Sequence, residues 1–260
     1  MDPGLVLAGL TVGLLVGLTG MGAGSLMTPI LISVFGIPAT TAVGTDLIYA
    51  SITKTFGAAR HLQLSNVNRE LAMWFGFGSV PAALAGTFAL YNLFDENVSE
   101  WLPEVIGYML ILVGIAVIIR TWVSIRGILD ASKLPTDGPL HRHHKIMAVV
   151  IGIVFGFLLG LTSVGSGVFF GMAMVTVFPL STRKVVGTDI FHGAMVTLAA
   201  ALGTILWGSP DFGVVGAILV GSIPGILIGS HFTARMNQRV LRSSIAGVLA
   251  ASGLKLLGAW

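Results

Sequence analysis

Two aspartates lie inside long apolar stretches of the chain, and each ends the same four-residue motif. The motif Val-Gly-Thr-Asp ends at Asp46 in the first half of the chain and at Asp189 in the second. A carboxylate within an apolar, membrane-length segment is costly to bury, usually faces the interior of the protein and often belongs to an ion or substrate pathway. Each acid could instead cap the N-terminus of a neighbouring half-helix. The two roles are not exclusive, and the sequence leaves both open.

A histidine distinguishes the surroundings of the two acids. His192 follows Asp189 by three residues and therefore lies on the same face of a helix, whereas Tyr49 stands at the corresponding distance from Asp46. A histidine can relay protons near neutral pH, although a hydrogen-bonded interior histidine is the alternative. The difference predicts that Asp189 carries a coupling proton and that Asp46 acts as a helix cap.

One lysine stands in the middle of an apolar stretch. Lys54 follows Asp46 by two helical turns, and the second half of the chain has Thr197 at the corresponding place. An interior ammonium group could bind an anion or pair with an acid. It could also extend along its aliphatic stem to the cytoplasmic end of the helix. All three interpretations remain open.

Glycines interrupt the chain shortly before each motif. They are Gly20, Gly22 and Gly24 in the first half, and Gly165 and Gly167 in the second. A chain that breaks here and resumes as a helix exposes unpaired N–H groups at a helix N-terminus, where the helix dipole also attracts anions. Irregular backbone survives at membrane depth only where it is buried in protein or lines a cavity. The breaks therefore predict an anion-binding site, with a tight turn or a packing contact as the alternative.

The elements that position these residues follow from the composition. The chain has 260 residues, of which 55% are hydrophobic and only 10% charged, with no cysteine, and its mean hydropathy is +0.94. A soluble domain carries about 25% charged residues because water must wet its surface. The surface of this protein must therefore face lipid.

Apolar stretches of membrane-crossing length divide the chain into ten segments. Two of them, 25–36 and 167–178, are too short to cross a hydrocarbon core of about 30 Å. The one long polar stretch separates a first repeat, 1–121, from a second, 146–260, through a linker at 122–145. The ten predicted segments are 4–19, 25–36, 42–59, 71–91, 104–121, 146–162, 167–178, 185–205, 213–234 and 243–259.

The two halves match in one ungapped register, 143 residues apart, as from Gly17 to Gly160. All four residues of the motif ending at Asp46 recur in the motif ending at Asp189. The segment Gly78-Ser79 with Pro81 and Gly86 recurs as Gly221-Ser222 with Pro224 and Gly229. Many matches between uncommon residues at a single offset indicate an internal duplication.

The basic loops change sides between the halves. Loop 60–70 carries Arg60 and Arg69, whereas its counterpart in the second half has only an acid. Loop 92–103 is acidic, and its counterpart 235–242 carries three arginines. Because lysine and arginine favour the cytoplasmic side, the repeats are predicted to be inverted, with the linker inside and both termini outside. This holds whether the first two segments of each repeat both cross or form one re-entrant hairpin.

The glycine breaks, the Val-Gly-Thr-Asp motifs that follow them, and the later Gly-Ser-x-Pro-x-x-x-x-Gly segments together resemble the sulfite exporter TauE/SafE family. The resemblance extends from about Gly9 to Leu257. It implies a secondary transporter for small sulfur-containing anions. Ser163 and Ser166 depart from the first half by adding hydroxyls. We expect substrate contacts from the breaks and the motif threonines, at Gly22, Gly24, Ser25, Thr45, Gly165, Ser166, Gly167 and Thr188.

The predicted fold is all-α: a polytopic transmembrane helical bundle of two inverted repeats of about five segments, each with a short glycine-broken hairpin.

The predicted function is secondary transport of sulfite, sulfoacetate or a related organosulfonate across the bacterial inner membrane, coupled to an ion gradient. A passive anion channel and a membrane-embedded enzyme are the alternatives. No nucleotide-binding loop, zinc-protease or hydrolase motif is present, so we expect neither catalysis nor a cofactor or metal. The net charge of +3 is small for nucleic-acid binding. Direction and oligomeric state stay open.

Overall fold

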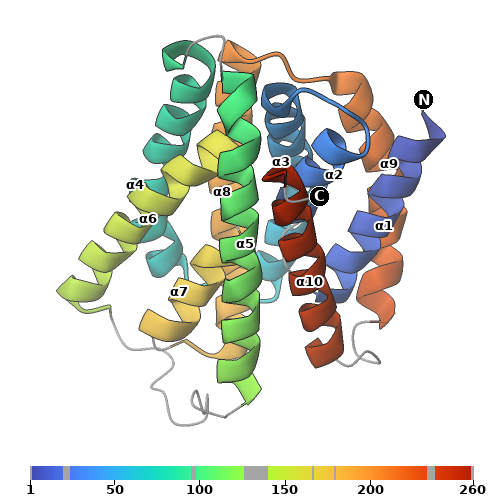
Figure 1. Cartoon of the computed structure of the whole chain (residues 1–260). Helices are drawn as coiled ribbons and strands as arrows, with labels where there is room; N and C mark the ends of the chain where they lie inside the picture. Colours follow the sequence, from blue (N-terminus) through green and yellow to red (C-terminus); the bar gives the residue numbers. More distant parts are fainter. Residues whose placement is uncertain are drawn as a thin grey trace.

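The computed structural model describes residues 2–19, 24–94, 98–125, 140–165, 167–178, 180–232 and 238–258. Within these ranges it contains ten α-helices, one short π-helical segment and no strand, which confirms the all-α prediction (Figure 1). Each predicted segment corresponds to one α-helix. The elements are α1 (Pro3–Thr19), α2 (Gly24–Ser33), α3 (Ala39–Gln63), α4 (Arg69–Phe88), η1 (Ala89–Leu93), α5 (Val98–Ile125), α6 (Arg142–Thr162), α7 (Phe169–Val177), α8 (Thr182–Trp207), α9 (Phe212–Phe232) and α10 (Gln238–Leu256).

The first two helices of each half form a hairpin whose two ends lie together. Gly4, at the start of α1, lies against the ring of Phe35 just beyond α2, where an added Cβ would be 3.2 Å from that ring. In the second half the rings of His144 in α6 and Phe178 after α7 have centroids 5.7 Å apart. Because α2 has 10 residues and α7 has 9, each is about 15 Å long or less. Both short arms are therefore too short to cross a hydrocarbon core of about 30 Å.

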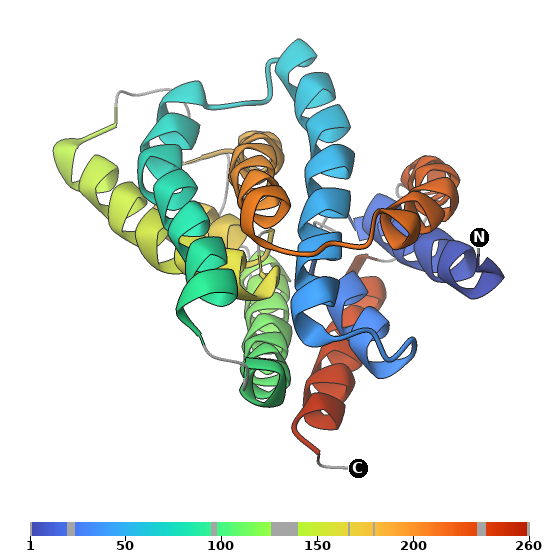
Figure 2. The same ribbon diagram turned by 90° about the horizontal axis from the view of Figure 1, so that it is seen from above.

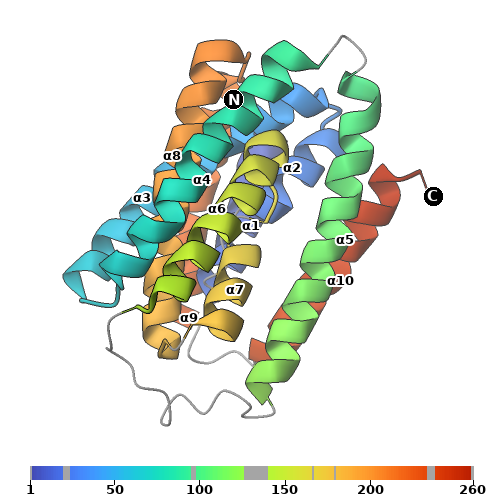
Figure 3. The same ribbon diagram turned by 90° about the vertical axis from the view of Figure 1, so that its left-hand side faces the viewer.

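The two halves interlock. Helix α1 packs along α9, α6 packs along α4, α3 lies against α8, and α5 lies against α10. Seen from above, α3 and α8 occupy the centre, with the α4–α6 pair on one side and the α1–α9 pair on the other (Figure 2). The α5–α10 pair stands together at one side of the bundle (Figure 3). The start of α1 and the end of α5 lie at opposite ends of the molecule (Figure 1).

Glycines allow the paired helices to approach closely. A Cβ added to Gly13 in α1 would lie 2.5 Å from the carbonyl oxygen of Ser222 in α9. A Cβ added to Gly156 in α6 would lie 2.5 Å from the carbonyl oxygen of Ser79 in α4. Small residues at such positions are typical of helix packing in membranes, where lipid supplies no hydrophobic force between helices. The two contacts are equivalent at the 143-residue offset.

The outer surface of the bundle is apolar. Large side chains such as Leu7, Phe56, Phe77 and Leu206 are among the most exposed, as expected where lipid replaces water. Five of the described helices are long and apolar enough to cross a membrane, and α3 is not among them. Helix α3 carries more polar residues, and it buries them: every residue from 42 to 51 is buried.

Candidate functional site

Polar side chains gather where the central helices α3 and α8 pass each other. Thr45, Asp46 and Lys54 on α3 are at most 7% exposed, and so are Thr188, Asp189 and His192 on α8. These are six of the residues that the sequence singles out. Burial of so many polar groups is costly unless they find partners, so their partners indicate what each one does.

Asp46 connects the two hairpins. Its Oδ2 atom accepts a hydrogen bond from the Thr28 hydroxyl of α2 at 2.5 Å and another from the Ser163 hydroxyl at 2.9 Å. Ser163 directly follows α6 and adopts a left-handed conformation with φ of 58°. The acid on α3 is therefore held by one residue from each hairpin, on opposite sides of the chain duplication.

The two chain breaks also contact each other. The Gly165 N–H donates to the Ser25 hydroxyl over 3.2 Å, joining the second break to the first turn of α2. Gly165 has φ of 90°, which glycine adopts without the penalty of a Cβ. Its carbonyl accepts from the N–H groups of Val168 and Phe169, so these two amides at the start of α7 are already paired. Gly24 begins α2 and Gly167 precedes α7, whereas Gly22 and Ser166 lie outside the described residues.

Thr28 and Ser163 were not among the predicted site residues. Thr28 follows Ser25 by three residues and therefore lies on the same face of α2, which is a signal the sequence contains. Ser163 differs from Gly20, the residue at the equivalent position of the first half. Its contact with Asp46 crosses 117 residues, and no local pattern predicts such a pairing.

The motif threonines bind backbone groups of the other repeat. The Asp211 N–H, just before α9, donates to the Thr45 hydroxyl over 3.1 Å. The Asn68 N–H, just before α4, donates to the Thr188 hydroxyl over 2.9 Å. Asp211 and Asn68 in turn accept hydrogen bonds from the first turns of α9 and α4. Both threonine hydroxyls thus stabilise helix starts in this structure, and their predicted substrate contacts stay a prediction.

Lys54 lies in the interior and does not extend to the end of its helix. It is 7% exposed and lies against Gly193 of α8, where an added Cβ would be 3.4 Å from its Nζ atom. The ammonium group attracts the carboxylates of both Asp189 and Asp46, and its interaction with Asp189 is the larger. The equivalent residue, Thr197, donates its hydroxyl to the Gly193 carbonyl instead. The central helices therefore share one cation between two acids.

His192 contacts α4 and two phenylalanines. Its Nε2 atom lies 2.7 Å from the Ser79 hydroxyl, and its ring centroid lies 5.4 Å from that of Phe75 and 4.4 Å from that of Phe170. Tyr49 faces Ser222 at the equivalent place, but its buried hydroxyl makes no hydrogen bond within the described part of the chain. His192 and Tyr49 thus lie at equivalent positions and each faces an equivalent serine, but their side chains differ in chemistry.

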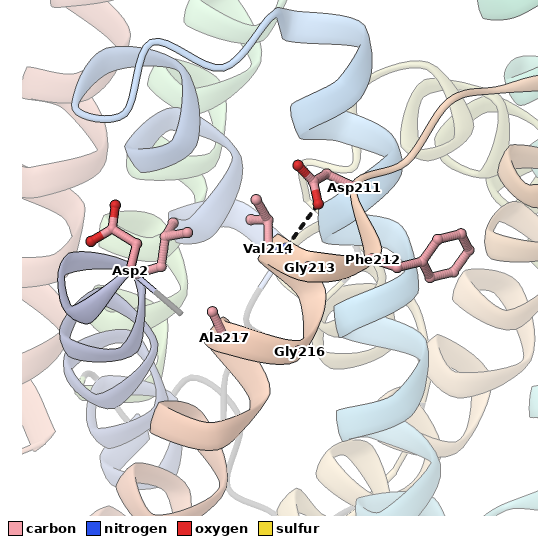
Figure 4. Close-up of a pocket in the computed structure, with 8 residues that line it drawn as sticks. Asp2, Asp211, Phe212, Gly213, Val214, Gly216 and Ala217 are labelled. Atoms are coloured by element: carbon pink, nitrogen blue, oxygen red, sulfur yellow. Dashed lines mark hydrogen bonds between the residues drawn. The ribbon is translucent and has the colours of Figure 1, made fainter.

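A cavity of about 380 Å³ lies elsewhere, between the first turns of α1 and α9 (Figure 4). The carboxylates of Asp2 and Asp211 lie at it, and they accept hydrogen bonds from the N–H groups of Gly4 and Val214. Two carboxylates would repel an anion, so this cavity does not match the predicted substrate. Its lining residues are Asp2, Leu5, Asp211, Phe212, Gly213, Val214, Gly216 and Ala217.

Among the described residues, no group of three or more histidines, cysteines and acids is arranged to hold a metal ion. The rings of His141, His143 and His144 lie together at the start of α6, with centroids 3.9 to 5.8 Å apart. No acid belongs to this group of three histidines, which lies at the end of the polar stretch that joins the halves.

A family model described as sulfite exporter TauE/SafE matches residues 5–256 of the chain. Among similar proteins, the probable membrane transporter protein YjnA of Bacillus subtilis is 41% identical over 261 residues, 99% of this chain and 100% of that protein. The probable membrane transporter protein YdhB of the same organism is 27% identical over 97% of this chain and 99% of its own. A probable membrane transporter protein of Methanocaldococcus jannaschii is 25% identical over 98% of this chain and 95% of its own. No solved structure shows a significant match.

Proposed function

Because the chain belongs to the sulfite exporter TauE/SafE family of membrane transporters, we propose that it is a secondary transporter for a small sulfur-containing anion. The substrate class comprises sulfite, sulfoacetate and related organosulfonates. Transport is coupled to an ion gradient across the cell membrane, the inner membrane in a bacterium. The anion binds where the two hairpins meet, between Ser25 and Gly165.

The meeting of the two chain breaks carries this proposal. The Gly165 N–H donates to the Ser25 hydroxyl. Thr28 and Ser163, which are close in sequence to these two residues, both donate to Asp46. Transporters built from repeats bind their substrates where interrupted helices of the two repeats come together, because half-helix N-termini point at the substrate there. The hydroxyls and amides at this point are paired with protein groups in this structure, and binding of an oxyanion would turn some of them from those partners to the anion.

Contacts that recur at the 143-residue offset support two inverted repeats. Thr45 corresponds to Thr188 and Asn68 corresponds to Asp211, so the hydrogen bond from Asp211 to Thr45 is equivalent to the one from Asn68 to Thr188. The two hairpins also open toward opposite ends of the molecule (Figure 1). Two copies of one unit in opposite orientation would produce both features.

The proposed site is closed to water in this structure. Ser25, Thr28, Asp46 and Ser163 are each at most 5% exposed. An anion can reach them only if a hairpin moves relative to the central helices. Motion of one hairpin would open the site to one side, and motion of the other would open it to the opposite side. This is alternating access around a fixed site.

Proteoliposomes containing the purified protein test the proposal. We expect uptake of labelled sulfite or sulfoacetate to exceed the external concentration under an imposed pH gradient and to lose that excess when a protonophore is added. Uptake that only equilibrates would indicate a passive channel. Chemical conversion of the sulfur compound by protein in detergent would indicate an enzyme. A thermal shift with sulfate, thiosulfate and small sulfonates identifies the preferred anion.

The predicted orientation is tested separately. The chain has no cysteine, so Ser99→Cys and Ser132→Cys each add a single reactive thiol. We expect a membrane-impermeant maleimide to label the Ser99→Cys protein, but not the Ser132→Cys protein, on intact spheroplasts. The reverse labelling pattern would invert the topology, with the linker outside.

A further inference from the structure

The two acids of the repeated motif share one buried cation unequally. The ammonium group of Lys54 interacts with both carboxyl groups, more strongly with that of Asp189 than with that of Asp46. Thr197, at the position equivalent to Lys54, adds no second cation. Among the buried side chains of the described residues, two carboxyl groups thus face one ammonium group. A buried charge without a counter-charge is costly.

Apart from Lys54, the groups near Asp46 are a tyrosine, a histidine and two hydroxyls. Tyr49 on α3 interacts with it electrostatically, and His192 on α8 lies near Lys54 and contacts Ser79. Helix α2 and the turn after α6 contribute the hydroxyls of Thr28 and Ser163. No second cation is among these groups.

The hydrogen bonds of Asp46 distinguish its two oxygen atoms. Oδ2 accepts two O–H bonds, whereas buried Oδ1 has no hydrogen-bond partner within the described ranges of the chain. Because both donors point at Oδ2, a proton on the carboxyl group belongs on Oδ1, where it would be a donor without an acceptor. The carboxyl group is 0% exposed, so no bulk water provides one.

We propose that an anion at the meeting point of the hairpins supplies this acceptor, and that Asp46 carries a proton on Oδ1 whenever the anion is bound. An ionised Asp46 would repel the anion, whereas a protonated one donates a hydrogen bond to it. The inference rests on the proposed function, since it assumes that the anion binds at this point. It assigns the coupling proton to Asp46 rather than to Asp189.

The step conserves protons and forms no covalent bond. Asp46 takes one proton from the side to which the site is open, and one anion binds with it. After the site opens to the other side, the anion leaves and the proton leaves Oδ1 for water. Anion and proton therefore cross in the same direction, one for one. Asp189 has a different environment, because Gly171 and Gly20 stand at the positions equivalent to Thr28 and Ser163 and offer no hydroxyl.

Binding of a sulfonate as a function of pH tests the inference. Methanesulfonate and thiosulfate are the probes, because sulfite itself gains a proton near neutral pH. We expect the affinity of the wild-type protein in detergent to fall by up to about tenfold per pH unit once Asp46 is ionised in the free protein, as one linked proton requires. A flat profile between about pH 5 and about pH 9 would overturn the inference.

The Asp46→Asn and Asp189→Asn variants identify the acid. An asparagine matches a protonated aspartate in shape and keeps one donor and one acceptor. We expect Asp46→Asn to bind the probe with no dependence on pH and to exchange anion in liposomes without moving protons. Asp189→Asn keeps the wild-type pH slope. Loss of the slope in Asp189→Asn, with the slope intact in Asp46→Asn, would move the coupling proton to Asp189, as the sequence alone predicts.

A second variant keeps the test valid if Asp46→Asn does not insert. Ser163→Ala with Thr28→Val removes the two donors that stabilise the ionised carboxylate. Binding should then persist to higher pH than in the wild type, and an unchanged or lowered midpoint would contradict the inference.

If the wild-type protein binds none of the anions at any pH, the proposed function fails. If it binds them without a proton linkage, the proposed function stands and only the role of Asp46 is lost.

Discussion

Helices α3 and α8 carry the same motif at equivalent places and yet hold their acids differently. On α3, Asp46 accepts two hydroxyl hydrogen bonds, one from each hairpin. On α8, Asp189 has the stronger interaction with the ammonium group of Lys54. Identical residues have acquired a hydrogen-bonded environment in one half and an ionic one in the other. The two motifs lie at equivalent places on their helices, and the residues around them give the two acids different environments.

The largest difference in the free energy of unfolding is expected between variants of Lys54 and of its counterpart Thr197. Lys54→Met leaves two buried carboxylates without a cation, and breaking a buried ion pair in this way costs about 3–5 kcal/mol. Thr197→Val removes only a hydroxyl bonded to Gly193 and costs about 1 kcal/mol. Thermal unfolding in detergent compares the two variants. Equal destabilisation would mean that Lys54 is not part of a buried ion pair.

Double variants sharpen this comparison. Adding Asp189→Asn to Lys54→Met removes the acid that interacts most strongly with the lysine, and we expect it to restore most of the lost stability. Adding Asp46→Asn should restore less, because Asp46 interacts less strongly with Lys54. The opposite order would show that Asp46 is the main partner of the lysine.

The next effect is expected at the chain breaks. Gly165→Val places a side chain at φ of 90°, where its Cβ would overlap the ring of Phe169, at a cost of about 1–3 kcal/mol. We expect loss of anion uptake in liposomes while the protein still inserts into the membrane. Gly22→Val, at the equivalent position outside the described residues, is expected to do the same. Wild-type uptake by both variants would reduce the breaks to simple turns.

A smaller difference is expected at the two serines that face the centre. Ser79→Ala removes the hydrogen bond to His192 and leaves a buried ring nitrogen unpaired, so it should cost about 1–3 kcal/mol. Ser222 faces Tyr49, whose hydroxyl makes no hydrogen bond with any described residue, so Ser222→Ala should cost less than about 0.5 kcal/mol. Chemical or thermal denaturation in the same detergent measures both. Equal costs would indicate that Tyr49 and Ser222 interact after all.

No difference is expected at the motif threonines. Thr45→Val and Thr188→Val each remove one hydrogen bond to a backbone N–H before α9 or α4, and each should cost about 1 kcal/mol. Anion affinity should stay close to the wild-type value in both. A marked loss of affinity in either variant, without a loss of stability, would restore the predicted substrate contact of that threonine.

Much of the fold could be predicted from the sequence because it depends on local patterns. Apolar runs of a given length predict helices, and the ten predicted segments match the ten helices of the described chain. The shortness of segments 25–36 and 167–178 predicted the two hairpin arms. Gly13 and Gly156 occupy positions at which two helices approach closely, as expected for glycines that recur along one helix face.

The partners of the buried polar groups could not be predicted in the same way. Sequence spacing placed His192 on the same helix face as Asp189, but it could not show that the ring contacts Ser79, Phe75 and Phe170. Spacing along one helix shows only which residues share a face. It does not show which residue of another helix comes to meet that face.

The sequence by itself determined the class of protein, the positions of its helices and the family, and it predicted the duplication, because each of these follows from composition or from matches along the chain. Only the tertiary structure decided that Asp46 lies between Thr28 and Ser163. It also decided that Lys54 interacts more strongly with Asp189 than with Asp46. The physical reason is that a buried polar group is stabilised by whatever donors and charges the packed helices bring within a few ångströms. In this protein those partners come from helices far apart in the chain.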